Sequence, residues 1–343
     1  MNDRAVNLLE QYEVEVLKTR KGRGAILCET SRGCLIFKEY TGNEERLAAQ
    51  NRLLLYLQQF NDIQVESIIP NREGELYVRD HDGVKYLLKT YAESRECNIN
   101  DRGECLESVR LLAKLHSYME FEKVEILPEL SCPVEESAKR YFFSPGMEYE
   151  KRNRELKKVR RYLKQRSQKT WFEICLQQNM DFFLEQAVTL SEEWSEYEKI
   201  RNEKNSENPM ITYCHGDYQY HNILKNSEGW FVINFEKCVP DDPVRDLYLL
   251  MRKLLEKSNW SVDLGRELVE AYEETRALSA LSRIDLYYRL AYPEKFWKIV
   301  NFYFNSGKAW IPGRNLEKLE KVVEQEAQKQ QFLDTLFRNI GKD

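Results

Sequence analysis

Residues 214–238 contain the side chains best suited to phosphoryl transfer. They read CHGDYQYHNILKNSEGWFVINFEKC: an H-G-D triplet, an Asn five residues after its Asp, and an apolar run that ends in Asn-Phe-Glu. Transfer of a terminal phosphoryl group needs a cation on the phosphates, oxygen ligands for a metal ion and a base beside the acceptor hydroxyl. Asp217 is the candidate for that base, and Asn222 is the candidate for a neutral oxygen ligand to Mg²⁺.

A lysine near the start of the chain is the candidate cation. Lys38, in CLIFKEY, falls on the third expected strand, where its ammonium group could reach phosphates beneath the turn KGRG. Each signal is weak alone, because H-G-D is a common tripeptide and Lys38 could be an ordinary edge-strand lysine. Their order is more informative: strand Lys, helix, hairpin, helical region, H-G-D-x4-N, then a strand ending in a polar, an aromatic and an acidic residue.

Short apolar runs and glycine turns organise the first part of the chain. Residues 12–40 hold three β-type runs separated by KGRG and SRG, which indicates an antiparallel meander. The next segment, GNEERLAAQNRLLLYLQQF, places three leucines on one helical stripe. GELYVRDHDGVKYLLKTY is then a hairpin around Asp82-Gly83. We therefore expect three strands, one helix and two strands up to residue 91.

The pattern after residue 91 is mostly helical. ECLESVRLLAKLHSYM is amphipathic, and residues 134–200 read as long charged helices broken at Ser144-Pro145-Gly146. Residues 214–238 interrupt them with two short strands about Asn226-Ser227-Glu228-Gly229, and several more helices follow from Pro243. The sequence shows no internal repeat and no low-complexity tract.

The composition indicates a globular protein. The chain has 343 residues, of which 42% are apolar, and its net charge is −5, so nothing global points to nucleic acid or to an anionic membrane. The first residues have no basic segment leading into an apolar one, and no stretch approaches the length of a membrane span, so we expect a cytoplasmic protein without a signal peptide. The eight cysteines form no C-x-x-C pair and are interpreted as buried free thiols.

The basic run KRNRELKKVRRYLKQRSQK at residues 151–169 is the one local charge anomaly. It could contact nucleic acid, an acidic partner or an anionic substrate. Tyr162 is its only aromatic residue, however, so it lacks the interleaved rings on which bases stack. We therefore interpret it as a solvated helix face.

The order and spacing of these motifs resemble the aminoglycoside phosphotransferase and choline kinase branch of the protein-kinase-like fold. In that branch the loop reads H-G-D-x4-N, and the metal strand usually reads I-D-F followed by Asp or Glu. Within it, the chain especially resembles the CotS-type spore coat proteins of endospore-forming bacteria. The resemblance covers nearly the whole chain and is carried by INFEKC, DLYLLMRKLLEKSNW and AYPEKFWKIVNFYFNSGKAWIPGRNLEKLEK, with YLLKTY and LLAKLH earlier.

The resemblance implies roles for individual residues. Asp217 matches the catalytic base, Asn222 the metal-side amide and Lys38 the phosphate-binding lysine. His215 matches a histidine that holds the loop by hydrogen bonds, and Asp246, in DPVRDLY, matches an Asp that braces it.

Further residues are assigned by the same resemblance. The backbone near Lys89, Thr90 and Tyr91 would form the hinge between lobes, which can bind an adenine edge. An acceptor pocket would lie in the helical lobe. Its candidate residues could equally well be packed in the core, and they are Tyr141, Phe142, Trp171 and Phe172.

Two departures from the family pattern bear on catalysis. Asn234 stands where the principal Mg²⁺-binding Asp belongs, which removes a full negative charge, although Mg²⁺ favours carboxylate oxygen. Glu236, two residues on and expected on the same face of an extended strand, could partly substitute. The position of the ion-pair partner of Lys38 falls at Gln50, although Glu44 and Glu45 lie a turn or more earlier. If Gln50 faces Lys38, that charge pair is lost too.

We therefore expect an α+β, two-lobed, protein-kinase-like fold, with a β lobe at residues 1–91 and a helical lobe at 92–343 that carries a basic helical insert near 134–170. Lys38, Asp217, Asn222, Asn234 and Glu236 should converge on one polar cleft. By resemblance, the expected function is a spore coat-associated protein on a kinase-like scaffold with weak, degenerate or absent phosphotransferase activity.

The alternative function is an active ATP-dependent phosphotransferase that acts on a hydroxyl of a small molecule or coat component. The expected cofactors are ATP and Mg²⁺, both weakly bound because of the two departures. The expected partners are other spore coat proteins and, if the protein is an enzyme, a small-molecule acceptor. We expect neither nucleic-acid binding nor membrane insertion.

Overall fold

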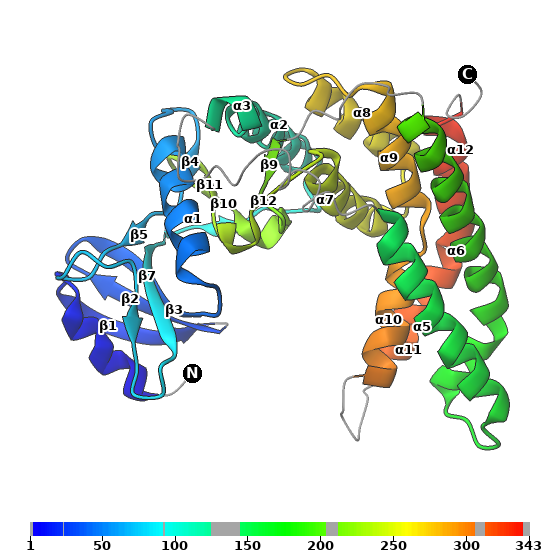
Figure 1. Cartoon of the computed structure of the whole chain (residues 1–343), viewed down its shortest axis with the longest axis horizontal. Coiled ribbons are helices and arrows are strands. Elements are labelled where there is room, and N and C mark those ends of the chain that lie inside the picture. Colours follow the sequence, from blue (N-terminus) through cyan, green and yellow to red (C-terminus); the bar gives the residue numbers. More distant parts are fainter. Residues whose placement is uncertain are drawn as a thin grey trace. The chain divides into compact units, whose positions relative to one another are not determined.

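The computed structural model describes residues 3–22, 24–91, 93–124, 145–203, 212–305 and 313–338 (Figure 1). The chain divides into two compact units, one comprising residues 1–137 and 212–240 and the other residues 138–211 and 241–343. Each unit contains its own packed elements and is described by itself. The two units have other boundaries than the two lobes that we expect to meet at residue 91. They do not test that division, which stays a prediction.

The first unit begins with a 3₁₀-helix, η1 (Asp3–Gln11), and is built on an antiparallel sheet. The meander, the following helix and the hairpin around Asp82-Gly83 confirm the expected order of elements. The sequence did not predict η1. It also did not predict β4 and β5, because strands of two residues are too short to show alternation. The sheet has the order β1 (Val16–Gly22), β2 (Ala25–Thr30), β3 (Gly33–Tyr40), β7 (Lys85–Thr90), β5 (Ile68–Ile69), with β6 (Val78–Arg79) also on β7.

The two faces of this sheet have different chemistry. Leu35, Phe37 and Leu88 face the apolar core of the unit, in which the rings of Phe37 and Tyr86 stack with centroids 5.3 Å apart. On β3 and β7, Ile36 pairs with Lys89, and directly paired residues share a face. Lys38, two residues after Ile36, therefore projects from the same face as Lys89, opposite the core.

A second sheet and several short elements complete the first unit. Helix α1 (Glu44–Leu57) contacts β4 (Gln64–Val65) and the 3₁₀-turn η3 (Phe235–Lys237). β4 continues the second sheet through β11 (Gly229–Val232) and β10 (Ile223–Asn226) to β8 (Arg95–Glu96), which confirms the expected hairpin about residues 226–229. The other elements are α2 (Arg102–Tyr118), α3 (Phe121–Val124), β9 (Thr212–Cys214), η2 (Tyr220–Asn222) and β12 (Val239–Asp241), which pairs with β9.

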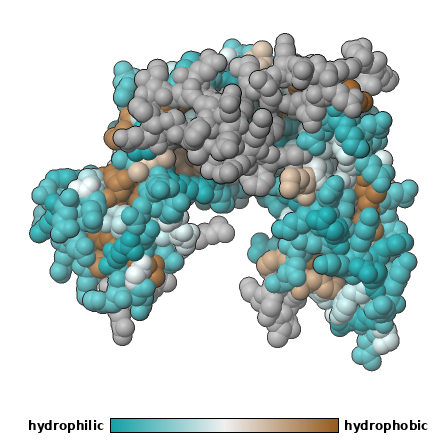
Figure 2. Space-filling model, viewed as in Figure 1, coloured by the Kyte–Doolittle hydropathy of each residue, from teal (hydrophilic) through white to brown (hydrophobic). Residues whose placement is uncertain are grey.

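The described part of the second unit is helical, as expected for residues after 134. Its core combines apolar side chains of α5, α6, α10 and α11. On the visible face of the molecule, hydrophilic residues predominate and hydrophobic patches are small and scattered (Figure 2). The helices are α5 (Pro145–Gln165), α6 (Trp171–Glu203), α7 (Val244–Lys257), α8 (Val262–Glu273), α9 (Ala280–Ala291), α10 (Glu294–Asn305), α11 (Arg314–Glu324) and α12 (Glu326–Leu336).

The expected break at Ser144-Pro145-Gly146 coincides with the start of α5, since Pro145 is its first residue, a position where its missing N–H does no harm. The structure adds an interruption at residues 166–170 that the sequence did not predict. The Thr170 hydroxyl accepts from the Glu173 N–H at 3.2 Å, and the Glu173 carboxylate accepts from the Thr170 N–H at 2.7 Å. This is a capping box, so Thr170-Trp171-Phe172-Glu173 is a helix-start motif that the sequence analysis did not identify.

The expected acceptor residues are only partly visible. Phe172 is buried and stacks on Tyr303 with centroids 4.1 Å apart, which is core packing, whereas Trp171 is exposed. Tyr141 and Phe142 lie outside the described residues, as does the first part of the basic insert. Seven of the eight cysteines are described and all of these are free thiols. Among the residues that the structure describes, no helix is long and apolar enough to cross a bilayer.

Gly265 should be intolerant of a methyl group. It lies in α8, and a Cβ atom built there would be 2.2 Å from a ring atom of Phe332, which is fully buried on α12. We expect Gly265→Ala to lower the free energy of unfolding by about 1–3 kcal/mol through overpacking. Gly313→Ala is the control, since nothing lies within 4 Å of that Cβ position. Equal urea midpoints for both variants would contradict the close helix contact.

Candidate active site

The histidine of the H-G-D triplet ties its loop to the segment before Asn234. His215 is fully buried, and its Nε2 lies 2.9 Å from the carbonyl oxygen of Ile233. The backbone N–H of Asp217 donates to Nδ1 at 3.2 Å, so Nδ1 accepts and the proton is on Nε2, which donates to Ile233. A neutral imidazole with this tautomer therefore links the two segments that carry the predicted site.

Gly216 allows the same two segments to touch through their backbones. Its φ is +78°, and a Cβ atom there would lie 2.1 Å from the carbonyl oxygen of Lys237. An L side chain would be strained by the dihedral angle and would collide with backbone that cannot move independently. The glycine of H-G-D thus has a structural reason in this chain, whatever chemistry the loop performs.

Asp217, the predicted base, is held by two local donors. Its Oδ1 accepts from Gln219 Nε2 at 2.6 Å, and its Oδ2 accepts from Lys237 Nζ at 2.9 Å. Partial burial acts to raise the pKa of Asp217, but the hydrogen bond and charge of Lys237 outweigh it and lower that pKa below its ordinary value. Asp217 is therefore a carboxylate at neutral pH, with an ammonium group beside it that the sequence reading did not identify.

The two asparagines of the predicted metal site bond to each other. Asn222 Nδ2 donates to the carbonyl oxygen of Asp217 at 2.8 Å, and Asn234 Nδ2 donates to Asn222 Oδ1 at 2.8 Å. Lys38 Nζ donates to Asn234 Oδ1 at 3.2 Å. An ammonium group can only donate, so the Asn234 atom that faces Lys38 must be oxygen, and its N–H then faces Asn222.

Glu236 reaches the site through a 3₁₀-turn and not through the extended strand that the sequence predicted. β11 ends at Val232, Asn234 has the left-handed angles φ 69° and ψ 55°, and Phe235–Lys237 form a 3₁₀-turn. The extended strand expected through Asn234 and Glu236 is therefore absent, because a residue with left-handed angles reverses the local chain direction. Asn adopts these angles more readily than most residues. Glu236 Oε1 nevertheless accepts from Lys38 Nζ at 2.9 Å.

A second lysine meets the same carboxylate. Lys89, on β7, is fully buried, and its Nζ lies 2.8 Å from Glu236 Oε1 and 2.7 Å from Glu66 Oε2. Glu66, also fully buried, accepts the backbone N–H of Phe235 on its other oxygen at 3.1 Å. The Glu66–Lys89 pair therefore holds both the backbone and the acid of the Asn-Phe-Glu triplet.

The electrostatics of Glu236 follow from these contacts. Burial acts to raise the pKa of its carboxyl group, but the ammonium groups of Lys89 and Lys38 outweigh burial and lower that pKa to about 2. Burial likewise acts to lower the pKa of Lys89, and the charges of Glu66 and Glu236 overcome it, so that this pKa is raised. Glu236 and Lys89 are therefore both charged at neutral pH. The sequence reading assigned Lys89 only to a hinge and missed Glu66, although a lysine in the apolar strand KYLLKT was a signal for a buried pair.

The structure thus brings together the five residues expected to converge, all within the first unit. Lys38, Asn234, Asn222 and the backbone of Asp217 form one hydrogen-bond chain, and Glu236 joins it at Lys38. The roles assigned to them as base, metal ligands and phosphate-binding group remain predictions.

Gln50 does not replace the missing ion-pair partner. Its side chain is buried in α1, and among the described residues neither its amide nitrogen nor its amide oxygen has a hydrogen-bond partner. Glu44, at the start of the same helix, pairs instead with Arg79 at 2.6 Å and Lys85 at 3.2 Å. The carboxylate that neutralises Lys38 is therefore contributed by η3 and not by α1.

The predicted hinge residues are engaged within the sheet. The Thr90 N–H donates to the carbonyl oxygen of Ser67 at 2.9 Å, and the Tyr91 N–H donates to that of Cys34 at 3.0 Å. An adenine edge would therefore have to use other backbone groups of this segment. Asp246 belongs to the second unit, where it is fully buried in the first turn of α7.

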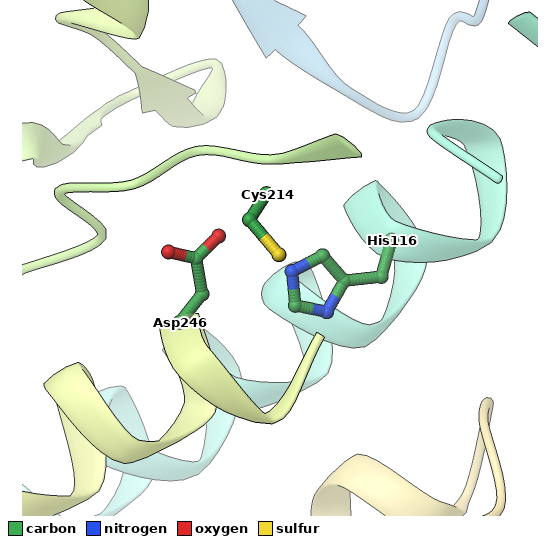
Figure 3. A group of neighbouring side chains, drawn as sticks. All are labelled: His116, Cys214 and Asp246. Carbon is green, nitrogen blue, oxygen red and sulfur yellow. The ribbon is translucent and has the colours of Figure 1, made fainter. Parts of the chain in front are cut away.

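Behind the loop, His116 of α2 and Cys214 of β9 face each other, as Figure 3 shows together with Asp246 of the second unit. Their potential ligand atoms lie within 4.8 Å of each other, and both side chains are fully buried. Two ligands from the first unit are fewer than a zinc site requires, so we assign no metal to them.

A resident Mg²⁺ ion does not fit the predicted ligand set as the structure arranges it. Three side-chain oxygens of this set already accept from protein donors: Asn222 Oδ1 from Asn234, Asn234 Oδ1 from Lys38, and Glu236 Oε1 from two ammonium groups. Mg²⁺ needs oxygen atoms at about 2.1 Å and favours carboxylates. Binding at these atoms would require the donors to leave and would place the ion against two lysine charges.

Replacing Lys89 with Met should destabilise the protein strongly at neutral pH. Two carboxylates would lose their shared cation, and breaking a buried pair from one side costs about 3–5 kcal/mol. Lys85→Met is the control on the same strand, because its partner Glu44 is half exposed, so about 1 kcal/mol or less is expected.

The effect of Lys89→Met should depend on pH in a defined direction. The depressed pKa of Glu236 contributes stability that is fully present above about pH 4.5 and is lost as the pH falls toward 2. The difference in unfolding free energy between native protein and Lys89→Met should therefore shrink between pH 7 and pH 3 in urea titrations. A difference that is constant over this range would show that Lys89 acts through packing alone.

Comparisons with known proteins agree with this geometry. The model of the family described as "Spore coat putative kinase YutH" matches residues 194–336, less than half of the chain. Among curated proteins, no sequence matches the chain.

Solved structures match over almost the full length. An aminoglycoside phosphotransferase from Alicyclobacillus acidocaldarius has a TM-score of 0.79 at 16% identity, covering 98% of this chain and 96% of that one. A spectinomycin phosphotransferase in complex with ADP and spectinomycin has a TM-score of 0.64 at 15% identity, covering 96% and 99%. A microcompartment-associated aminopropanol kinase has a TM-score of 0.60 at 13% identity, covering 97% of both chains. The chain therefore has the predicted kinase-like fold of these phosphotransferases, and residues 194–336 carry the sequence pattern of the spore coat kinase family.

Proposed function

We propose that the protein is a spore coat-associated protein that uses a kinase-like scaffold and has weak, degenerate or absent phosphotransferase activity. The coat association is supported by the family match over residues 194–336, and the scaffold by the structural likeness. The observation that carries the loss of activity is the hydrogen bond from Asn234 Nδ2 to Asn222 Oδ1. It places an amide N–H where a carboxylate and a metal ion would otherwise meet.

This substitution changes the local charge as well as the geometry. Phosphoryl transfer depends chiefly on positioned charges that stabilise the transferring group. The described site holds three ammonium groups, Lys38, Lys89 and Lys237, and they are paired with three carboxylates at 2.7–2.9 Å, namely Glu66, Asp217 and Glu236. The network is neutral and satisfied by itself. A nucleotide triphosphate would meet no excess positive charge, so we expect weak binding of ATP and Mg²⁺.

The second candidate is an active ATP-dependent phosphotransferase, and the state of Asp217 favours it. Asp217 is ionised and fixed beside Asn222, as a base requires. In such a reaction Asp217 would take the proton of an acceptor hydroxyl, whose oxygen forms a bond to the γ-phosphorus while the bond to ADP breaks. Lys237 would first have to leave the carboxylate. A spectinomycin phosphotransferase with the same fold was solved with ADP and its acceptor, which supports a nucleotide in this type of site.

The partners belong to the same proposal. Other coat proteins are the expected partners of a coat-associated scaffold, and a small-molecule acceptor applies only if the protein is an enzyme. The net charge of −5 supports the expectation that neither nucleic acid nor an anionic membrane is bound.

Asn234→Asp tests the proposal. The new carboxylate would face Asn222 Oδ1 without an N–H between them, so the variant should melt below native protein in EDTA. Mg²⁺-ATP should then stabilise it more than native protein, by RT ln(1 + [L]/Kd), because a carboxylate ligand has been restored. We expect Kd to fall roughly tenfold, which is about 1.4 kcal/mol. Melting shifts and ATP turnover are measured with and without Mg²⁺.

Two further variants make the outcome decisive. Asn226→Asp adds the same charge in the β10–β11 turn, where its oxygen still accepts from Glu228 and Gly229, and it should behave as native protein. Asp217→Ala removes the predicted base. Turnover by native protein that Asp217→Ala abolishes would overturn the scaffold proposal in favour of an enzyme. If no variant shows an ATP-dependent shift at millimolar nucleotide, the segment does not bind nucleotide.

A further inference from the structure

The α5–α6 hairpin of the second unit has two outer faces of opposite charge. The helices lie side by side (Figure 1) and run antiparallel, because Arg160 pairs with Asp181 at 2.5 Å while Asn153 Nδ2 donates to the carbonyl oxygen of Ala187 at 3.2 Å. These two contacts define which residues of α5 and α6 lie at the same level along the hairpin.

The outer face of α5 is basic. Tyr149, Leu156 and Leu163, spaced by seven residues, are buried in the core of the second unit. Lys151 and Lys158, also seven apart, are exposed on the opposite side of the helix. No ion pair involves either lysine among the residues that the structure describes. These two lysines therefore carry charges that no described residue of the chain pairs.

The outer face of α6 is acidic and partly apolar. Glu185 and Glu192 are exposed and again seven residues apart, and within the described ranges neither takes part in an ion pair. Large apolar side chains occur on the same helix face, with exposed fractions of 79% for Trp171, 55% for Phe182 and 44% for Ile200. These three residues are widely spaced along α6, so the charged positions and not an apolar patch argue for a partner.

We infer that a second copy of this chain covers the hairpin, with α5 of each copy against α6 of the other. A two-fold axis parallel to the helices exchanges α5 and α6, so the basic face of each copy meets the acidic face of its partner. The antiparallel register places Glu185 and Glu192 within about one helical turn of the level of Lys158 and Lys151. The equal seven-residue spacing allows both charge pairs to form together.

The surface is large enough for a stable pair of subunits. The two helices lie side by side over the length of α5, whose 21 residues span about 32 Å. A strip of that length and about 20 Å wide offers roughly 640 Å² per copy, which is near the lower limit of about 600 Å² per partner for specific interfaces. Phe182 lies near the middle of α6 and at the level of Lys158, where it can contribute an apolar centre between the charged positions.

A second copy fits this surface better than the partners first considered for the basic run. Nucleic acid or an anionic membrane would be attracted to α5 and repelled by the glutamates of α6. An acidic protein segment would leave the glutamates unpaired. Only a partner that carries both stripes satisfies both helices at once, and this chain carries both. The inference is independent of nucleotide binding and of the proposed function.

Charge reversal in pairs tests the inference with the full-length protein. In sedimentation at about 50 mM salt, native protein should be a dimer whose dissociation constant rises roughly tenfold or more by 0.5 M salt. Lys151→Glu with Lys158→Glu makes both outer faces acidic, and Glu185→Lys with Glu192→Lys makes both basic. Each double variant should be monomeric by itself. A one-to-one mixture of the two should restore the dimer, because every contact is again between opposite charges.

Two controls distinguish a loss of this interface from misfolding and from a general effect of surface charge. Glu317→Lys with Glu324→Lys reverses two exposed glutamates, also seven residues apart, on α11, and should leave the native dimer unchanged. Rescue on mixing cannot result from misfolding, since two unfolded variants would not reconstitute a dimer. The inference is overturned if native protein is monomeric at 100 µM and low salt. It is equally overturned if native protein is dimeric but the mixture stays monomeric, or if only the lysine reversals have an effect.

Discussion

The buried ammonium group of Lys89 constrains the first unit more than any other single group. A charge removed from water needs partners with good geometry, and here it needs two carboxylates, Glu66 and Glu236, within 2.8 Å. These three side chains come from β7, from the link between β4 and β5, and from η3. Because Glu66 also accepts the N–H of Phe235, the pairing positions the backbone of the triplet as well as its acid. The predicted site is thus assembled around an interaction that does not itself touch a substrate.

This arrangement explains how Lys38 is neutralised without a charged residue on α1. Glu236 accepts from Lys38 and Lys89 together, so the two lysines on one face of the sheet share one carboxylate. Gln50 is buried, and its amide has no hydrogen-bond partner in the described part of the chain, which costs free energy. The balance of charge is consequently internal to the network.

The two proposals rely on different units and on different physics. In the first unit, the lysines and carboxylates of the predicted site are paired with one another. In the second unit, Lys151 and Lys158 of α5 and Glu185 and Glu192 of α6 are exposed and pair with none of the described residues, and we infer that they meet a second copy of the chain.

Local sequence determined much of this protein. Glycine turns and period-two alternation were sufficient for the meander and both hairpins, and the H-G-D-x4-N spacing together with Lys38 was sufficient for the convergence of the site residues. The sequence also identified Asn234 as a departure from the family pattern, because an Asn in the place of an Asp can be recognised without a structure. It could not reveal the Glu66–Lys89 pair or the 3₁₀-turn at Glu236. Alternation reports which face a residue occupies but not which distant residue faces it, and Glu66, Lys89 and Glu236 meet only through contacts between segments far apart in the chain. Only the tertiary structure decided that the acid predicted to bind metal lies against two lysines.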